Sequence, residues 1–189
     1  MVPYLNKLHL ILITGSLILF CRDVVYPQDL TRNWQQIETT YTLLKYKQIN
    51  DLIKFNDSIK FGPSNWNPSS SLVELSQIEI SKMVSLKTDA IFERVQKILD
   101  MRKPFARPSI KIYSNIDELK KAYRKIYNSE CKIRAWYRYR TNTIYINVND
   151  VHAGMVAHEL AHAIIDHFLV VKPPPQTAEI LARYVDSHL

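Results

Sequence analysis

Residues 156–167, VAHELAHAIIDH, carry three histidines, one glutamate and one aspartate among Ala, Leu, Ile and Val. Ionisable side chains are costly to bury unless a partner compensates them. His158, Glu159 and His162 fit the pattern H-E-x-x-H. On a helix, residues i and i+4 lie one turn apart on the same face, so the two imidazoles can converge on one metal ion. The spacing therefore predicts a metal site, and the alternative is a pair of structural histidines.

The donor atoms of this motif suit zinc. Neutral imidazole is a preferred ligand of Zn²⁺, and two histidines leave its tetrahedral coordination incomplete. Glu159 is displaced from the two histidines by about 100° around a helix. Its carboxylate can therefore lie near the open coordination position of the metal ion without coordinating the ion. We expect Zn²⁺ as the cofactor.

A third protein ligand must come from elsewhere in the chain. Asp166 is the nearest acid, but His158, His162 and Asp166 would span about 12 Å along a straight helix. Ligands about 2 Å from one zinc ion cannot cover that length. The pattern H-E-x-x-H-x-x-G-x-x-H is also absent, because positions 165 and 168 are Ile and Phe.

Glu179 is the best remaining candidate for the third ligand. It follows three consecutive prolines at 173–175, which can fold the chain back on itself. The neighbouring residues Ile180, Leu181 and Val185 can pack on the preceding helix. The alternative for Glu179 is a solvated acid in the first turn of a helix, where the helix dipole favours negative charge.

The stretch HELAHAIID followed by AEILARY resembles the gluzincin metallopeptidases, the thermolysin-like group. The resemblance covers residues 143–189 and is closest to the small, single-domain forms. It implies zinc bound by His158, His162 and Glu179, with Glu159 as the general base that takes a proton from a metal-activated water. It also implies that the strand at 143–148 lies along the cleft, where a peptide substrate can pair with it.

Larger gluzincins carry a further domain with a Tyr or His that helps to bind the oxyanion. In this chain Tyr184, His167 and His188 are candidates for that role. Metal-bound histidines usually donate their second N–H to a carboxylate or a carbonyl. Asp166 and Asp186 are candidates for such a partner, with a surface position as the alternative for each.

Hydrophobic periodicity and turn residues predict the elements that must position these groups. The order of elements indicates an α+β fold, a small mixed or antiparallel sheet packed on helices. A buried HExxH helix, capped by Asn149 or Asp150 and running to about Val170, is followed by a C-terminal helix that carries Glu179. His152 has no motif partner and is expected at the start of the HExxH helix. The other expected elements are strands at 38–46, 109–113, 132–140 and 144–148, helices at 50–61, 88–101 and from Asn115 onward, and a loop at 61–71.

Residues 132–140 alternate between apolar and basic side chains, as in a half-buried strand. A non-catalytic, zinc-containing envelope protein could use the basic face of this hairpin to bind peptide, glycan or anionic lipid. The presence of Glu159 favours an enzyme, because a binding module needs no general base. A third possibility is a peptidase whose partner supplies part of the cleft. The basic face consists of Lys132, Arg134, Trp136, Arg138 and Arg140, and the opposite face of Ile133, Ala135, Tyr137 and Tyr139.

Residues 1–21 contain the apolar run LHLILITGSLILF, which has the length of a signal-peptide core and is short for a membrane span. We expect a signal peptide or membrane anchor at 1–21, followed by a single domain at 22–189. The protein would then be exported, whether periplasmic, secreted or membrane-anchored. Cys21 allows lipid attachment, although Phe20 is bulky for a lipobox. With only Cys131 besides, no disulfide framework is expected.

The formal net charge of +7 is concentrated in residues 102–140, where twelve Lys and Arg face three acids. Such a segment can attract acidic partners, or it can be an ordinary solvated surface. No nucleic-acid-binding motif accompanies it, so no nucleic-acid partner is expected. The leading hypothesis is therefore an exported zinc-dependent peptidase, a hydrolase acting on a peptide or protein substrate, with possible membrane association through the N-terminal segment.

Overall fold

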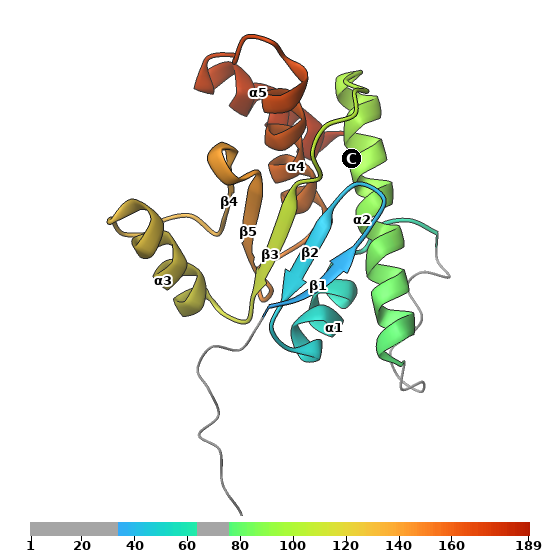
Figure 1. Cartoon of the computed structure of the whole chain (residues 1–189). Coiled ribbons are helices and arrows are strands. Elements are labelled where there is room, and N and C mark those ends of the chain that lie inside the picture. The colour runs from blue at the N-terminus through green and yellow to red at the C-terminus, as the bar shows by residue number, and fades with distance from the viewer. Residues whose placement is uncertain (1–33, 64–75) are drawn as a thin grey trace, which may run out of the picture. The chain divides into compact units, whose positions relative to one another are not determined.

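The computed structural model describes residues 34–63 and 76–189, and Arg32–Leu189 group into one compact unit. The fold is α+β, a mixed sheet packed on helices, as the sequence predicts (Figure 1). The predicted leader at 1–21, Cys21 and most of the predicted loop at 61–71 lie outside the described residues. The elements are β1 (Gln35–Glu38), β2 (Leu43–Tyr46), α1 (Ile49–Ser58), α2 (Gln77–Leu99), β3 (Ser109–Tyr113), α3 (Ile116–Tyr127), β4 (Ala135–Arg138), β5 (Thr143–Asn147), α4 (Ala153–Phe168) and α5 (Pro175–Ser187).

The five strands are ordered β1-β2-β3-β5-β4. β2, β3 and β5 run parallel, and β1 and β4 flank them as antiparallel strands. After β3 the chain passes through α3 to β4, which lies at the edge of the sheet. The β4–β5 hairpin then places β5 between β3 and β4. Among the described residues, no helix has both the length and the apolarity needed to cross a membrane.

The two faces of the sheet are covered differently. One face carries the main core, in which α1, α2, α4 and α5 pack on apolar side chains of the strands. The opposite face carries a smaller aromatic cluster beneath α3 (Figure 1). The strand residues in the main core are Leu44, Tyr46, Ile110, Ile112, Ile144 and Ile146, and the cluster beneath α3 consists of Tyr113, Leu119, Cys131, Trp136 and Tyr145.

The predicted single strand at 38–46 is wrong, because the chain reverses at residues 39–42 to form the β1–β2 hairpin. The Thr39 hydroxyl contacts the Thr42 hydroxyl at 3.0 Å and accepts from its backbone N–H at 2.9 Å. The Asp89 carboxylate on α2 accepts from the Thr39 hydroxyl and from the backbone N–H groups of Thr40 and Tyr41, at 2.6 to 3.1 Å. A residue 50 positions away thus fixes this turn.

Two helices, α2 and α4, have N-termini that differ from the predicted ones. α2 begins at Gln77 and not at 88, because Ser76 and Glu79 form a capping box. α4 is capped by His152, whose Nδ1 accepts from the Met155 N–H at 3.2 Å, and not by Asn149 or Asp150. His152 therefore does stand at the helix start, as predicted.

Lys87 is a buried cation that holds α2 to α1. Its side chain is 1% exposed, and its ammonium donates to the Asn56 carbonyl at 2.7 Å. Burial lowers the pKa of Lys87 to about 8, with a smaller contribution from Lys60. Since the pKa is depressed in the folded state, the unfolded chain binds more protons between pH 8 and 10.5, and stability rises with pH across that window.

We expect the free energy of unfolding to increase between pH 8 and 9.5 by up to about 1.4 kcal/mol per pH unit from this one group. Lys87→Met should remove that increase, while Lys97→Met, at an exposed position of the same helix, should retain it. Urea denaturation at several pH values measures both. Equal pH slopes in the wild type and Lys87→Met would contradict the assignment.

Candidate metal centre

α4 is the central helix of the site, and its apolar side chains are buried around most of its surface. The fully buried residues Leu160 and Ile164 anchor it in the main core. This leaves the partly exposed His158 and His162 on the side that faces α5. The helix thus presents the two imidazoles to one partner, as the i, i+4 spacing predicts.

α5 carries Glu179 to those imidazoles. The helix starts at Pro175, where a proline costs little because the first N–H groups of a helix have no internal partner. Ala178, Ala182 and Val185 form its buried face, and the two small alanines allow a close approach to α4. Glu179 lies beside that face, so its carboxylate reaches the two histidines of α4.

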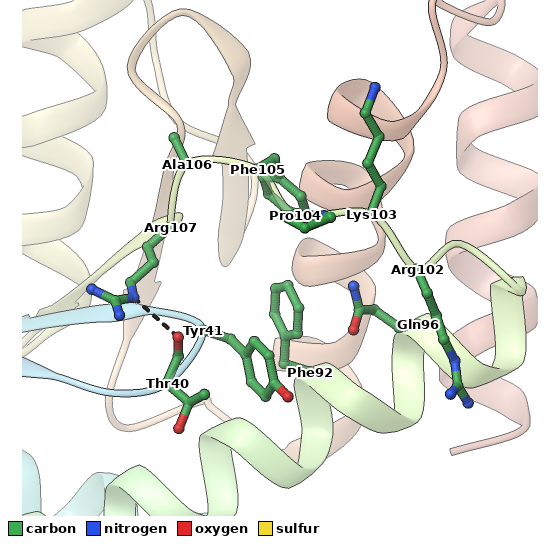
Figure 2. Close-up of a pocket in the computed structure, with 10 residues that line it drawn as sticks. All are labelled: Thr40, Tyr41, Phe92, Gln96, Arg102, Lys103, Pro104, Phe105, Ala106 and Arg107. Atoms are coloured by element: carbon green, nitrogen blue, oxygen red, sulfur yellow. Dashed lines mark hydrogen bonds between the residues drawn. The ribbon is translucent and has the colours of Figure 1, made fainter.

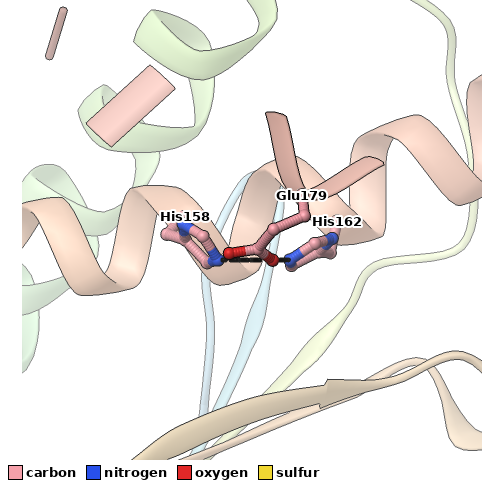
Figure 3. A group of neighbouring side chains, drawn as sticks. All are labelled: His158, His162 and Glu179. Atoms are coloured by element: carbon pink, nitrogen blue, oxygen red, sulfur yellow. Dashed lines mark hydrogen bonds and ion pairs between the residues drawn. The ribbon is translucent and has the colours of Figure 1, made fainter. Parts of the chain in front are cut away.

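The three side chains converge on one point (Figure 3). The Nε2 atoms of His158 and His162 are 3.2 Å apart. Glu179 Oε2 lies 3.6 Å from the Nε2 of His158 and 3.5 Å from that of His162. Among the described residues, this is the group of His, Cys, Asp and Glu side chains with the geometry to hold a metal ion.

These distances suit a small tetrahedral cation. Ligand atoms about 2.05 Å from a tetrahedral metal lie about 3.3 Å from one another. The three measured separations, 3.2, 3.5 and 3.6 Å, bracket that value closely. Two imidazole nitrogens and one carboxylate oxygen also match the donor set of open zinc sites, which keep a fourth position for water or substrate. The residues present therefore fit a metal ion of the zinc type.

The protonation states of the site favour metal binding. Burial lowers the pKa of His162, and the neighbouring His158 lowers it further, so this imidazole is neutral at pH 7. Burial alone would raise the pKa of Glu179, but a 2.8 Å hydrogen bond from Arg183 and the two imidazoles outweigh it and lower the pKa. The site thus offers one neutral imidazole and one carboxylate without the loss of a proton.

Glu159 is not one of the three converging side chains, but it lies in the same cleft. It is 7% exposed. Burial raises the pKa of Glu159 to about 8, and the charge of Glu179 adds to the rise, while the backbone N–H of Tyr137 opposes it. A buried carboxylate beside a metal site, but outside its ligand set, has the position of a proton acceptor.

We call the hollow around these residues the metal cleft. Its volume is about 500 Å³, and β4, α4, α5 and the α4–α5 connection form its walls. The apolar face predicted for residues 132–140 lines it, together with Lys172 and Pro173. The lining residues are Ile133, Ala135, Trp136, Tyr137, Tyr139, His158, Glu159, His162, Asp166, Lys172, Pro173, Pro175, Ala178 and Glu179.

The two acids considered as partners of the imidazoles lie apart from the ligand atoms. Asp166 accepts from Lys172 at 3.1 Å at the wall of the cleft. Asp186 lies at the other end of α5 against Gly154, where a Cβ on Gly154 would overlap the Asp186 carboxylate. Neither carboxylate makes a hydrogen bond to His158 or His162 within the described part of the chain.

The three residues considered for the oxyanion have different surroundings. Tyr184 and His188 stack on each other, with ring centroids 4.0 Å apart, and do not line the metal cleft. His167 Nε2 is 3.1 Å from the Tyr137 hydroxyl, behind the cleft wall. Tyr139 is an exposed aromatic residue that lines the cleft, on the predicted apolar face of 132–140, and it had no predicted role.

One residue of the basic hairpin face, Trp136, is buried, whereas Lys132, Arg134 and Arg140 are exposed. Trp136 is 6% exposed and stacks on Tyr145, with centroids 4.5 Å apart, and the ring of Tyr123 lies edge-on to it at 5.0 Å. α3 covers Trp136 on this side of β4, while the basic side chains beside it are exposed or partly exposed. Alternation along a strand identifies its two faces, but not the element that packs on each.

The strand predicted at 143–148 corresponds to β5, and it has no free edge along the metal cleft. β5 pairs with β3 on one side and with β4 on the other. β4 is the edge strand and lines the metal cleft. Comparisons of the chain with protein-family models, curated proteins and solved structures gave no match, so the interpretation of the site depends on its geometry.

We expect Glu179→Gln to weaken zinc binding by more than about 100-fold, because one of three protein ligands loses its charge. Asp166→Asn should change the affinity by less than about tenfold, because Asp166 contributes no atom to the ligand set. Titration against a competing chelator, with metal content by mass spectrometry, measures both. The reverse ranking would move the ligand to Asp166, and a wild type that cannot be loaded with zinc would refute the site.

Proposed function

We propose that this chain is an exported zinc-dependent peptidase of the gluzincin type, with Zn²⁺ held by His158, His162 and Glu179. The observation that carries the proposal is the separation of the three ligand atoms, 3.2 to 3.6 Å, at the wall of an open cleft. A bound Zn²⁺ would supply a Lewis acid that polarises a carbonyl and makes water more acidic.

Glu159 would act as the general base. Its carboxylate lies in the metal cleft next to a ligand, and its burial gives it a high affinity for a proton. It would accept the proton of the attacking water at a carboxylate oxygen and return it to the amine nitrogen of the leaving product. Its low exposure also shields that proton from bulk solvent.

β4 would orient the substrate. Within the described part of the chain, one side of β4 pairs with β5 and the other side borders the metal cleft. The Tyr137 N–H already faces the Glu159 carboxylate, so an extended peptide would add through the other backbone groups of this edge, irrespective of its sequence. The proposal therefore transfers to β4 the role that the sequence analysis assigned to 143–148.

The retained carboxylate at 159 separates the peptidase from a binding protein. A protein that only bound zinc and peptide would gain nothing from a buried acid beside the ligands, which costs folding energy when it ionises. The burial of Trp136 further weakens the case for a ligand-binding basic hairpin face. The enzyme is therefore the interpretation that these residues support best.

Glu159→Gln keeps the shape of the side chain and removes its basicity. We expect zinc content to stay unchanged, because Glu159 is outside the ligand set, and peptide cleavage to fall by roughly 10²–10⁴-fold. Assays on a mixed peptide library, with metal analysis of the same sample, measure both quantities. Glu130→Gln, at an exposed position, serves as the matched control.

Loss of zinc from Glu159→Gln would identify the residue as a ligand. Retention of both zinc and activity would show that the hydrolysis comes from another site or from a contaminant.

Export is the part of the proposal that depends on residues 1–21. The apolar run there has the length of a signal-peptide core. A reporter that is active only in the cytoplasm, fused after Asp29, should therefore give no signal, whereas deletion of residues 2–21 should restore it. Activity of the undeleted fusion would refute the proposed location.

A further inference from the structure

A second hollow, which we call the loop pocket, lies where residues 102–107 pass over α2. Its volume is about 670 Å³, larger than that of the metal cleft. Figure 2 shows Phe92 and Gln96 rising from α2, with Tyr41 beside them and Pro104 and Phe105 opposite. The rings of Tyr41, Phe92 and Phe105 contact one another in turn, so they form one aromatic wall of the pocket. Its lining is completed by Thr40, Arg102, Lys103, Ala106 and Arg107.

A row of stacked rings joins the loop pocket to the metal cleft. Tyr41 stacks on Phe92 at 4.8 Å, and Phe92 contacts Phe105 at 5.9 Å between ring centroids. Phe105 stacks on His167 at 5.0 Å, and His167 contacts Tyr139 at 5.4 Å. Tyr139 lines the metal cleft, so the two hollows share a continuous aromatic wall.

The charge of the loop pocket is positive. Arg107 is neutralised by Glu38 and donates to the Thr40 carbonyl at 3.0 Å. Arg102 and Lys103 are exposed and form no ion pair within the described part of the chain. The Gln96 amide, which faces the pocket, makes no hydrogen bond there either. The rim thus offers two free cations and one free amide to an incoming ligand.

We propose that the loop pocket binds an acidic segment of the peptide substrate that also carries a large apolar side chain. The apolar side chain would pack against the partly exposed Tyr41 and Phe105, and the acids would face Arg102 and Lys103. The pocket would thus select substrates at a distance from the cleavage site. This inference rests on the proposed peptidase function.

The direction of β4 determines which end of the substrate would reach the loop pocket. Antiparallel pairing gives the more stable ladder, so a peptide on the β4 edge would run against it. β4 runs from Ala135 to Arg138, and a 3-10 turn at Tyr139–Thr141 follows it directly. The N-terminal part of the peptide would therefore lie at Tyr139, beside His167 and Phe105. The acidic, apolar segment is expected on the N-terminal side of the cleaved bond.

The test uses a short neutral peptide that the zinc-loaded wild type cleaves, extended at its N-terminus with either Phe and two Glu or Phe and two Lys. We expect the acidic extension to lower KM by at least tenfold relative to the basic one. The double variant Arg102→Glu, Lys103→Glu should reverse that preference and cleave the unextended peptide normally. Lys120→Glu with Lys121→Glu, on α3, is the matched control and should behave as wild type.

Replacement of Phe by Ala in the acidic extension should raise KM several-fold, which tests the aromatic wall without altering the protein. Equal KM values for the two extensions, or a preference that survives the double charge reversal, would overturn the inference while leaving the peptidase function intact.

Binding provides a readout that does not need cleavage. In a Glu159→Gln background, a fluorescent peptide with the acidic extension should bind at least tenfold more weakly to the Arg102→Glu, Lys103→Glu variant than to its parent. If no peptide is cleaved but this difference is found, the peptidase function fails and the acidic-peptide site stands. Equal affinities would refute the site itself.

Discussion

The contact between α4 and α5 is the interaction on which the candidate site depends, because it brings together ligands from two helices. Glu179 must stand within 3.6 Å of both imidazoles, and Ala178 and Ala182 allow that approach by their small size. At the far end of the same interface, the Asp186 carboxylate lies against Gly154, where a Cβ would displace it. Asp186 places a negative charge at the N-terminal turn of α4, where the helix dipole favours it.

The sheet gives this helix pair its orientation relative to a substrate. The strand core residues Ile110, Ile112, Ile144 and Ile146 support α4 from beneath, and α2 packs beside it. Placing β5 inside the sheet leaves β4 at the edge next to α4. The same topology sets the end of β4 near the loop at 102–107, so the metal cleft and the loop pocket come to share one wall.

Features that depend on local spacing were predictable, and features that depend on distant partners were not. The pairing of His158 with His162 follows from helix periodicity. Glu179 could be predicted as the third ligand because Asp166 lies too far along the helix to share one ion with both histidines. The turn at Thr39 escaped prediction because Asp89, far along the chain, completes its hydrogen bonds. Trp136 looked like a surface residue because nothing in its own strand indicates that α3 covers it. The capping box formed by Ser76 and Glu79 is a sequence pattern, so the start of α2 at Gln77 could have been predicted.

The electrostatics of the site would make a bound metal ion part of the fold's energy balance. Glu159 is buried, and the nearby charge of Glu179 raises the cost of ionising it. In the absence of a cation, a protonated Glu159 avoids that cost, and the pKa of about 8 reflects it. A divalent cation between the imidazoles and Glu179 would bring two positive charges to two carboxylates. Its binding would favour the ionised form of Glu159, which is the form a general base requires, and would stabilise the folded chain by mass action.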